Sequence, residues 1–180
     1  MTTDEYIVKL RAKMNAIKAN NKPLALAVAS VHAEQMERIF VKGGAESGKI
    51  GSYSTKPMLA SKGQFIDTGK FKITKWTKFK KAKKAIPVME IGGGYKAFRA
   101  LNGRESSFVN LRWTGDLQRD LSNSLQKISP HTYVSGTKRK INSDKSEWME
   151  DKYGSIFNLS KKEKTKFNKI ALQELYNSLK

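Results

Sequence analysis

Residues 23–40 read PLALAVASVHAEQMERIF, and this stretch decides much of the fold. Its apolar side chains recur every three or four positions, which is the spacing of one face of an α-helix. Proline suits the first turn of a helix, and Gly43 and Gly44 suit the region just past its end. The stretch therefore predicts an amphipathic helix whose apolar face packs against other elements.

A second amphipathic pattern precedes this helix. Four apolar side chains share one helical face there: Ile7, Leu10, Met14 and Ile17. Thr3 and Asp4 are candidates for the N-cap, and the polar residues before Pro23 interrupt the pattern. We therefore expect residues 1–22 to form an N-terminal helical arm and residues 23–180 to form a single α+β domain.

Residues 43–84 differ in composition from the rest of the chain. Glycine, serine, threonine and lysine dominate, and the scattered aromatic and aliphatic side chains follow no period for long. The sequence predicts a long flexible loop between the N-terminal helices and the sheet, which is unusual unless the loop is functional or becomes ordered on assembly. The loop is also basic, since residues 41–84 hold 12 Lys and Arg against 2 Asp and Glu.

The strand signals follow this loop. Val109, Leu111 and Trp113 alternate with polar residues, as in a half-buried β-strand, and a Thr-Gly-Asp turn comes next. Residues 125–128 and 133–135 indicate two further short strands separated by a proline. Together these stretches predict a small antiparallel sheet.

Two helices are expected towards the C-terminus. Residues 143–152 have a helical pattern that Gly154 ends, and Ser160 with Glu163 three positions later forms a capping box for a final helix. One face of that helix is apolar: Phe167, Ile170, Ala171, Leu175 and Leu179. The order of helices, loop, strands and helices is typical of an α+β fold, with packed helices beside a small antiparallel sheet.

The composition narrows the classes of function. Zero cysteines exclude disulfides and thiolate metal sites, and with only His32 and His131 as histidines we expect no metal site and no cofactor. No apolar run is long enough to cross a bilayer, and the N-terminus lacks the apolar core of a signal peptide, so we expect a cytoplasmic protein without membrane contact. The formal net charge of +19 favours a polyanionic partner.

Three motifs resemble catalytic or nucleotide-binding sites without completing them. Gly43–Lys49 has the spacing of a phosphate-binding loop, but Ile50 stands where that loop needs Ser or Thr. Gly92–Gly94 lack the spacing of a dinucleotide fingerprint and favour a turn or a close approach of two backbones. The acidic residues 144, 147, 150 and 151 have helical spacing with Lys145 and Lys152 interleaved, and they fit a solvated helix face. We therefore expect no catalytic residues and no enzyme.

A lysine run with interleaved aromatic side chains is the candidate binding site. Its members are Lys70, Lys72, Lys75, Trp76, Lys78, Phe79, Lys80, Lys81, Lys83 and Lys84, with Phe71 beside them. Lysines can follow the phosphates of a nucleic acid while aromatic rings stack on its bases. A charge run that only keeps the chain soluble fits about equally well, and docking against a neighbouring subunit is a third interpretation.

The order of five short stretches along the chain gives a further indication of the kind of protein this is. They are Arg38–Phe40, Gly48–Ser54, Gly94–Arg99, Val109–Leu117, and Glu147–Met149 with Tyr153–Ser160. In this order they resemble phage virion-morphogenesis proteins of the tail-completion type, over about residues 30–175. The resemblance implies an α+β fold with a long loop between its helices and its small sheet. It also implies assembly as a ring at the head–tail junction or the tail end, without catalytic residues.

The expected function follows from this resemblance. We expect a structural virion component, acting as a ring-forming tail-completion or head–tail connector (neck) subunit in virion assembly. Its partners would be copies of itself, other phage neck, portal or tail proteins, and packaged DNA. It would be located in the virion, and in the host cytoplasm during assembly. The alternative is a nonspecific nucleic-acid-binding protein, which the charge of +19 supports.

Overall fold

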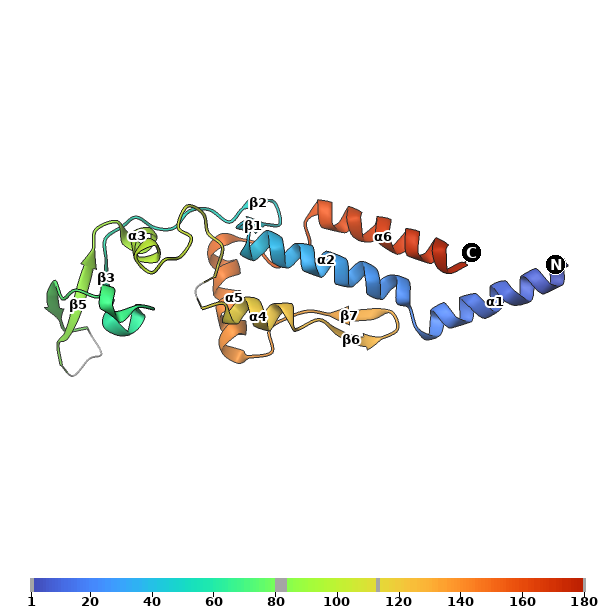
Figure 1. The fold of residues 1–180 in the computed structure, drawn as a ribbon, viewed down its shortest axis with the longest axis horizontal. Helices are drawn as coiled ribbons and strands as arrows, with labels where there is room; N and C mark the ends of the chain where they lie inside the picture. The colour runs from blue at the N-terminus through green and yellow to red at the C-terminus, as the bar shows by residue number, and fades with distance from the viewer. Residues whose placement is uncertain (1, 80–83, 113, 180) are drawn as a thin grey trace. The chain divides into compact units, whose positions relative to one another are not determined.

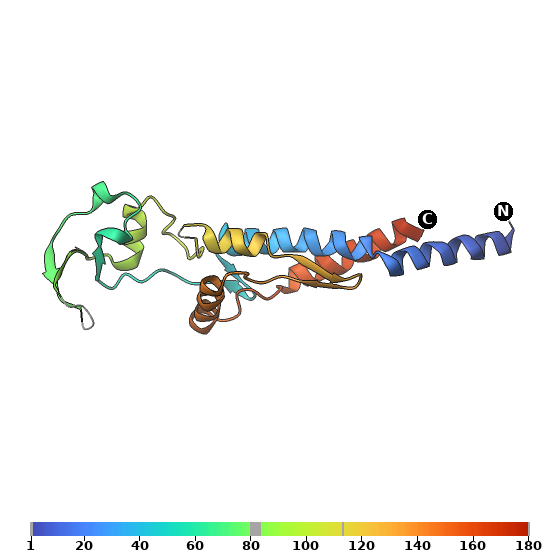
Figure 2. The same cartoon turned by 90° about the horizontal axis from the view of Figure 1, so that it is seen from below.

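Helices and small antiparallel sheets make up the fold (Figures 1 and 2). The computed structural model describes residues 2–79, 84–112 and 114–179. Within these residues lie six α-helices and seven short strands. The α+β class predicted from the sequence is confirmed.

The chain folds as two compact units. Residues 1–49 and 111–180 make up the helical unit, and residues 50–110 make up the sheet unit. The sheet unit is therefore inserted in the sequence of the helical unit. The boundary expected at residue 22, between an arm and a single domain, falls inside the helical unit.

Five helices form most of the helical unit. They are α1 (Thr3–Ala19), α2 (Lys22–Phe40), α4 (Asp116–Ser122), α5 (Lys140–Tyr153) and α6 (Lys161–Leu179). Two antiparallel hairpins accompany them: β1 (Gly44–Ala45) with β2 (Gly48–Lys49), and β6 (Gln126–Ser129) with β7 (Thr132–Val134). The helices predicted at 143–152 and after Ser160 and the strands predicted near 125–128 and 133–135 are confirmed. None of the described helices is long and apolar enough to span a membrane.

Helix α2 carries the core of the helical unit. Its buried face includes Ala27, Val31, Ile39 and Phe40, and the last two are at most 1% exposed. Helix α6 lies alongside α2 in both views (Figures 1 and 2). Burying a side chain of this size contributes about 1.5–3 kcal/mol, so the packing of α2 against α6 is a main source of stability for this unit.

Helix α1 begins one residue earlier than the sequence indicated. The N-cap is Thr2, whose Oγ1 accepts a hydrogen bond from Glu5 N at 3.3 Å, while Thr2 N donates to Glu5 Oε2 at 2.9 Å. Thr3 and Asp4, the expected caps, lie in the first turn instead. The reason is spacing, because only Thr2 has a glutamate three positions later to complete a capping box.

The sheet unit contains a three-stranded antiparallel sheet with a helix beside it. Its elements are β3 (Met58–Ser61), β4 (Lys75–Thr77), β5 (Ile86–Ile91), α3 (Gly94–Leu101) and two short 3-10 turns, η1 (Lys62–Gln64) and η2 (Thr68–Lys70). Strand β5 lies between β3 and β4. The core side chains are Ala60, Phe65, Val88, Ile91 and Phe98.

In the part of residues 43–84 that the structure describes, residues 43–79 and 84, the chain does not form the single long loop that the sequence predicted. The segment holds strands β1 to β4 and the turns η1 and η2. The prediction was wrong because these strands are two to four residues long, which is too short for an alternating pattern to emerge. The strand that pairs with both β3 and β4, β5, also lies beyond residue 84.

The glycine triplet that follows β5 includes one position, Gly94, where only glycine fits without strain. Its φ of +63° lies in the left-handed region, which suits glycine. A Cβ at this position would come within 2.6 Å of the carbonyl carbon of Thr55 and would collide with the carbonyl oxygen of Lys56. The predicted close approach of two backbones is confirmed at Gly94.

The strand predicted over Val109–Trp113 does not exist in the described part of that stretch. Val109 and Asn110 are buried in irregular structure. Leu111 has a φ of 53°, which breaks an extended backbone, and the boundary between the two units falls just before it. Trp113 lies outside the described residues, so its expected place in the core stays a prediction.

Candidate functional site

The sheet unit concentrates the positive charge of the protein. Residues 50–110 hold 13 Lys and Arg against 3 Asp and Glu, a net charge of +10 out of +19 for the whole chain. The rest of the chain is almost twice as long and holds the remaining +9. A surface of this kind attracts polyanions over about 10 Å at 0.1 M salt.

Strand β4 brings part of the lysine run to one edge of the sheet. It pairs only with β5 among the described strands, so its other edge is unpaired there. Lys75 forms an ion pair with Glu90 on β5 at 3.0 Å. Trp76 and Phe79 are 66% and 44% exposed. The lysines of the run that the structure describes are all exposed: Lys70, Lys72, Lys75, Lys78 and Lys84. Lys80, Lys81 and Lys83 lie outside the described residues.

The three aromatic side chains of this segment divide into two roles. Phe71 is half-buried and packs against Phe65, with ring centroids 5.4 Å apart, and Phe65 packs against Phe98 at 5.1 Å. Phe71 therefore belongs to the core of the sheet unit. Trp76 and Phe79 remain as exposed apolar groups among lysines.

A buried polar network supports the sheet unit, and sequence reasoning did not anticipate it. Arg99 is 2% exposed, and its Nε donates to the carbonyl oxygen of Glu105 at 2.7 Å. Its Nη2 donates to Asn110 Oδ1 at 2.9 Å, and its guanidinium lies 4.4 Å from the ring centroid of Tyr53. Tyr53 in turn accepts a hydrogen bond from Asn110 N at 3.2 Å. These interactions tie the two ends of the sheet unit to α3.

A second network clamps the helical unit. Arg38 Nε donates to Glu163 Oε1 at 2.8 Å, and Glu163 is 1% exposed. The other Arg38 nitrogens donate to three carbonyl oxygens: those of Gly44 at 2.8 Å, Ile156 at 3.2 Å and Asn158 at 2.8 Å. Ser160 donates to Glu163 Oε2 through its N at 2.7 Å and its Oγ at 2.9 Å, so the predicted capping box is confirmed. We call this set the Arg38 clamp.

The charge state of Glu163 follows from these contacts. Burial of the carboxyl acts to raise its pKa, but hydrogen bonds from Arg38 and Ser160 outweigh burial and hold the pKa below its ordinary value. Glu163 is therefore an ionised partner of Arg38 at neutral pH. Its role is to join α6 to the end of α2.

The motifs that resembled a phosphate-binding loop and a paired-carboxylate site make hydrogen bonds that hold parts of the helical unit together. Gly43–Lys49 spans the β1–β2 hairpin, where Gly44 gives its carbonyl oxygen to the Arg38 clamp. Glu150 on α5 accepts hydrogen bonds from Ile156 N and Phe157 N at 3.2 and 3.1 Å. Within residues 2–79, 84–112 and 114–179, no group of three His, Cys, Asp or Glu side chains is placed to hold a metal ion.

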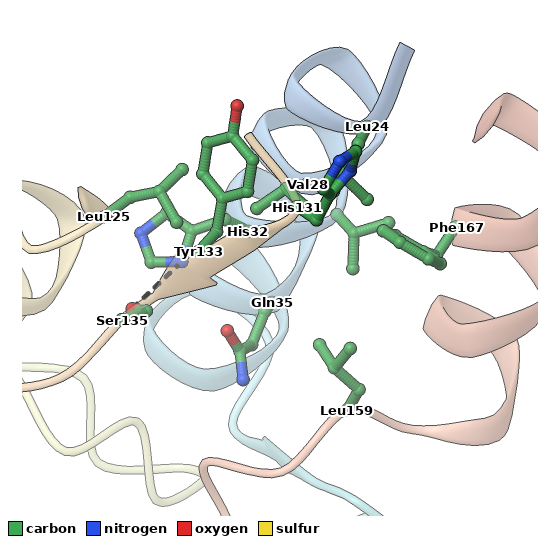
Figure 3. Close-up of a pocket in the computed structure, with 11 residues that line it drawn as sticks. Leu24, Val28, His32, Gln35, Leu125, His131, Tyr133, Ser135, Leu159 and Phe167 are labelled. Atoms are coloured by element: carbon green, nitrogen blue, oxygen red, sulfur yellow. Dashed lines mark hydrogen bonds between the residues drawn. The ribbon is translucent and has the colours of Figure 1, made fainter. Parts of the chain in front are cut away.

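Both histidines line one pocket of the helical unit (Figure 3). The pocket has a volume of about 360 Å³ and lies between α2, the β6–β7 hairpin and the start of α6. Its walls are mostly apolar: Leu24, Val28, Val31, Leu125, Leu159 and Phe167. His32 Nδ1 lies 3.4 Å from Ser135 Oγ at one side, and His131 Nδ1 lies 3.2 Å from Asn21 Nδ2 at the other. Such a pocket suits apolar side chains better than a charged substrate.

Comparison of the chain with family models, curated proteins and solved structures gave no match.

Proposed function

We propose that this protein is a structural component of a bacteriophage virion, acting as a ring-forming tail-completion or head–tail connector subunit. The observation that carries the proposal is the number of large apolar side chains left in water on regular elements. On β4 this is Trp76, with Ile73 and Phe79 exposed in the irregular segments on either side of it, and on α6 they are Leu172 and Tyr176. Exposed apolar groups that cluster on rigid elements are typical of surfaces that other molecules cover.

The motif residues support a role in architecture. Arg38, Tyr53, Arg99 and Asn110 belong to the stretches that resemble tail-completion proteins. Their side chains are engaged in the Arg38 clamp and in the sheet-unit network, where they join distant parts of each unit. Residues with this placement hold a scaffold in shape, which is what a subunit that works by contacts requires.

The proposal is tested by the state of the purified protein and by its place in particles. Native mass spectrometry should detect a closed oligomer of one size, and negative-stain images should show rings. Quantification of purified virions that contain the protein should give a fixed copy number. A protein that stays monomeric at all concentrations and is absent from purified particles would refute the proposal.

Nonspecific nucleic-acid binding is the second candidate, and the basic edge of the sheet unit favours it. Five exposed lysines lie along the chain from η2 to the start of β5, and exposed Trp76 offers a ring for base stacking. In this case the affinity for DNA should fall steeply with salt, since each phosphate contact contributes about −0.9 to the log–log slope. Binding that does not change with salt would exclude this candidate.

Two sets of substitutions separate these functions. Replacing Trp76 and Phe79 with serine removes apolar contact area and leaves the charge unchanged, so it should impair assembly more than DNA binding at low salt. Replacing the five described lysines with glutamine should do the reverse. Assembly that survives the aromatic substitutions would show that this edge does not dock on a subunit.

A further inference from the structure

The three-stranded sheet has two outer edges, and their backbone groups are satisfied to different extents. On β3, Ser61 N donates to Gln64 Oε1 at 2.7 Å, so the Gln64 side chain occupies part of that edge. On β4, no described side chain is hydrogen-bonded to the backbone of Trp76. The β4 edge is therefore the more open of the two within the described part of the sheet unit.

Pro87 determines the direction in which the backbone of Trp76 points. The two residues lie opposite each other in the β4–β5 pair, and proline has no N–H to donate. Val88 O accepts a hydrogen bond from Thr74 N at 2.9 Å, so the backbone of Val88 faces β4. Bonded and non-bonded pairs alternate along an antiparallel ladder, which makes Trp76–Pro87 a non-bonded pair. The N–H and C=O of Trp76 consequently point away from β5, towards the open side of the sheet.

The surroundings of this edge are basic. Lys75 is paired with Glu90 at 3.0 Å, and Asp67 Oδ1 accepts a hydrogen bond from Gly69 N at 2.9 Å. Four further lysines are exposed and form no ion pair with a described carboxylate: Lys70, Lys72, Lys78 and Lys84. Lysines of this kind repel a second copy of the same edge and attract a strand that carries carboxylates.

We propose that the β4 edge binds an extended acidic segment of a partner protein, which adds to the sheet as a further strand. A peptide strand satisfies both the N–H and the C=O of Trp76, whereas phosphate oxygens accept from the N–H and have nothing to donate to the C=O. The Trp76 ring is 66% exposed and offers an apolar contact to a side chain of the segment. The inference rests on the proposed function of a subunit that acts by contacts, and it names the kind of partner that this site takes.

The partner is a different protein and not a second copy of this chain. Adjacent acids occur in this sequence only at Asp4–Glu5 and Glu150–Asp151. The first pair lies in α1 and the second in α5, so neither offers an extended acidic strand.

The first experiment measures the binding of the full-length protein to labelled peptides by fluorescence anisotropy at low salt. A short peptide of alternating glutamate and valine should bind, and the same peptide with lysine in place of glutamate should not. A third peptide keeps the glutamates and carries N-methyl groups along one backbone edge, which removes the N–H donors of that edge. It should bind about fivefold more weakly, because strand addition needs those donors.

Substitutions at Trp76 separate the contribution of the backbone from that of the ring. Trp76→Val removes the ring and keeps the outward N–H, whereas Trp76→Pro removes both. Proline is tolerated on an edge strand where its nitrogen faces solvent, so both variants should melt like the parent. Trp76→Pro should bind the acidic peptide about fivefold more weakly than Trp76→Val. If Trp76→Pro melts lower, the N-methylated peptide tests the same hydrogen bonds on the parent protein.

A second pair of variants tests the charge of the edge. Lys72→Gln with Lys78→Gln should weaken binding of the acidic peptide by about threefold to tenfold. Lys161→Gln with Lys169→Gln is the matched control, because it removes the same charge from exposed positions on α6, in the helical unit. The control variant should bind the peptide like the parent.

The outcomes distinguish this partner from a nucleic acid. Equal binding of the acidic and N-methylated peptides, or no binding of either, would overturn strand addition. A single-stranded oligonucleotide that binds at this edge while the acidic peptide does not would assign the edge to nucleic acid instead.

The outcomes also separate this inference from the proposed function. Rings and a fixed copy number in particles, together with no binding of the acidic peptide, would overturn the inference alone. A protein that stays monomeric and is absent from particles would overturn the proposed function, whatever the peptides show.

Discussion

Replacing Arg38 with methionine should lower the free energy of unfolding by about 3–5 kcal/mol. Methionine is also long and unbranched, so it keeps much of the packing of the arginine stem and removes the guanidinium. The change leaves Glu163, which is 1% exposed, as a buried carboxylate without its cation. It also removes the donor for the carbonyl oxygens of Gly44, Ile156 and Asn158.

The magnitude follows from what the clamp would lose. Removing one partner of a buried ion pair costs about 3–5 kcal/mol, because the remaining charge keeps its desolvation penalty. A typical domain is stable by about 5–15 kcal/mol, so the variant should be marginal but measurable. The double variant Arg38→Met with Glu163→Leu should be more stable than Arg38→Met alone, because it no longer buries an unpaired charge.

The assay is urea denaturation followed by circular dichroism, repeated at several pH values. The folded-state pKa of Glu163 lies below its ordinary value of 4.5. Its contribution to stability is therefore complete above that value and is lost as the pH falls through the folded-state pKa. In Arg38→Met, burial is no longer offset by the cation, so the folded-state pKa of Glu163 should rise above its ordinary value. The carboxylate then lowers stability at neutral pH, and protonation as the pH falls through the raised pKa removes that cost. A variant that matches the parent in midpoint and in pH dependence would refute the clamp as a source of stability.

Three further predictions test the sheet unit and its charged edge. Gly94→Ala should destabilise the protein by at least about 2 kcal/mol in thermal melting, through its positive φ and the collision with Lys56, whereas Gly63→Ala, with open space around it, should have little effect. Arg99→Lys should cost about 2–3 kcal/mol in urea denaturation, since lysine cannot reproduce the two-directional hydrogen bonding of the guanidinium; an unchanged midpoint would contradict this. If DNA binds, the joint replacement of the five described lysines by glutamine should reduce the log–log salt slope by up to about 4.5 in filter binding, and an unchanged slope would show that these lysines do not contact phosphates.

Helices α1, α2, α5 and α6 could be predicted because their signals are local, whereas the shorter α3 and α4 were not predicted. The apolar face of α2, the Ser160–Glu163 capping box and Gly154 after α5 all act within a few residues, and each has the predicted role. The N-cap of α1 was misplaced by one residue because Thr2 and Thr3 are adjacent and equally suited by type. Only the position of Glu5 distinguishes them.

The sheet unit was harder to predict because the pairing of its strands depends on residues that are distant in the sequence. Strand β4 is three residues long, and its exposed Lys75 and Trp76 carry no core pattern. Its place is set by pairing with β5, about ten residues later in the chain. The candidate site shares this limit, since nothing local to Phe71 indicates that it packs on Phe65 while Trp76 remains exposed.

The buried networks could not be predicted for the same reason, because their partners lie even further apart in the sequence. Arg38 and Glu163 are 125 positions apart, and no periodicity links them. Arg38 lies in a stretch that resembles a known family, and Glu163 was predicted only as part of a capping box. Neither signal indicated that the two side chains are partners.

The insertion of the sheet unit between α2 and α6 sets an order of events on the ribosome. About 120 residues must be synthesised after α2 before α6 begins, which takes about 6–25 s at usual elongation rates. The sheet unit is continuous in sequence and can fold during that interval, while Val31, Ile39 and Phe40 still await their covering helix. The nascent chain thus carries an uncovered apolar helix next to a finished unit, and this interval is when it most needs protection by a chaperone.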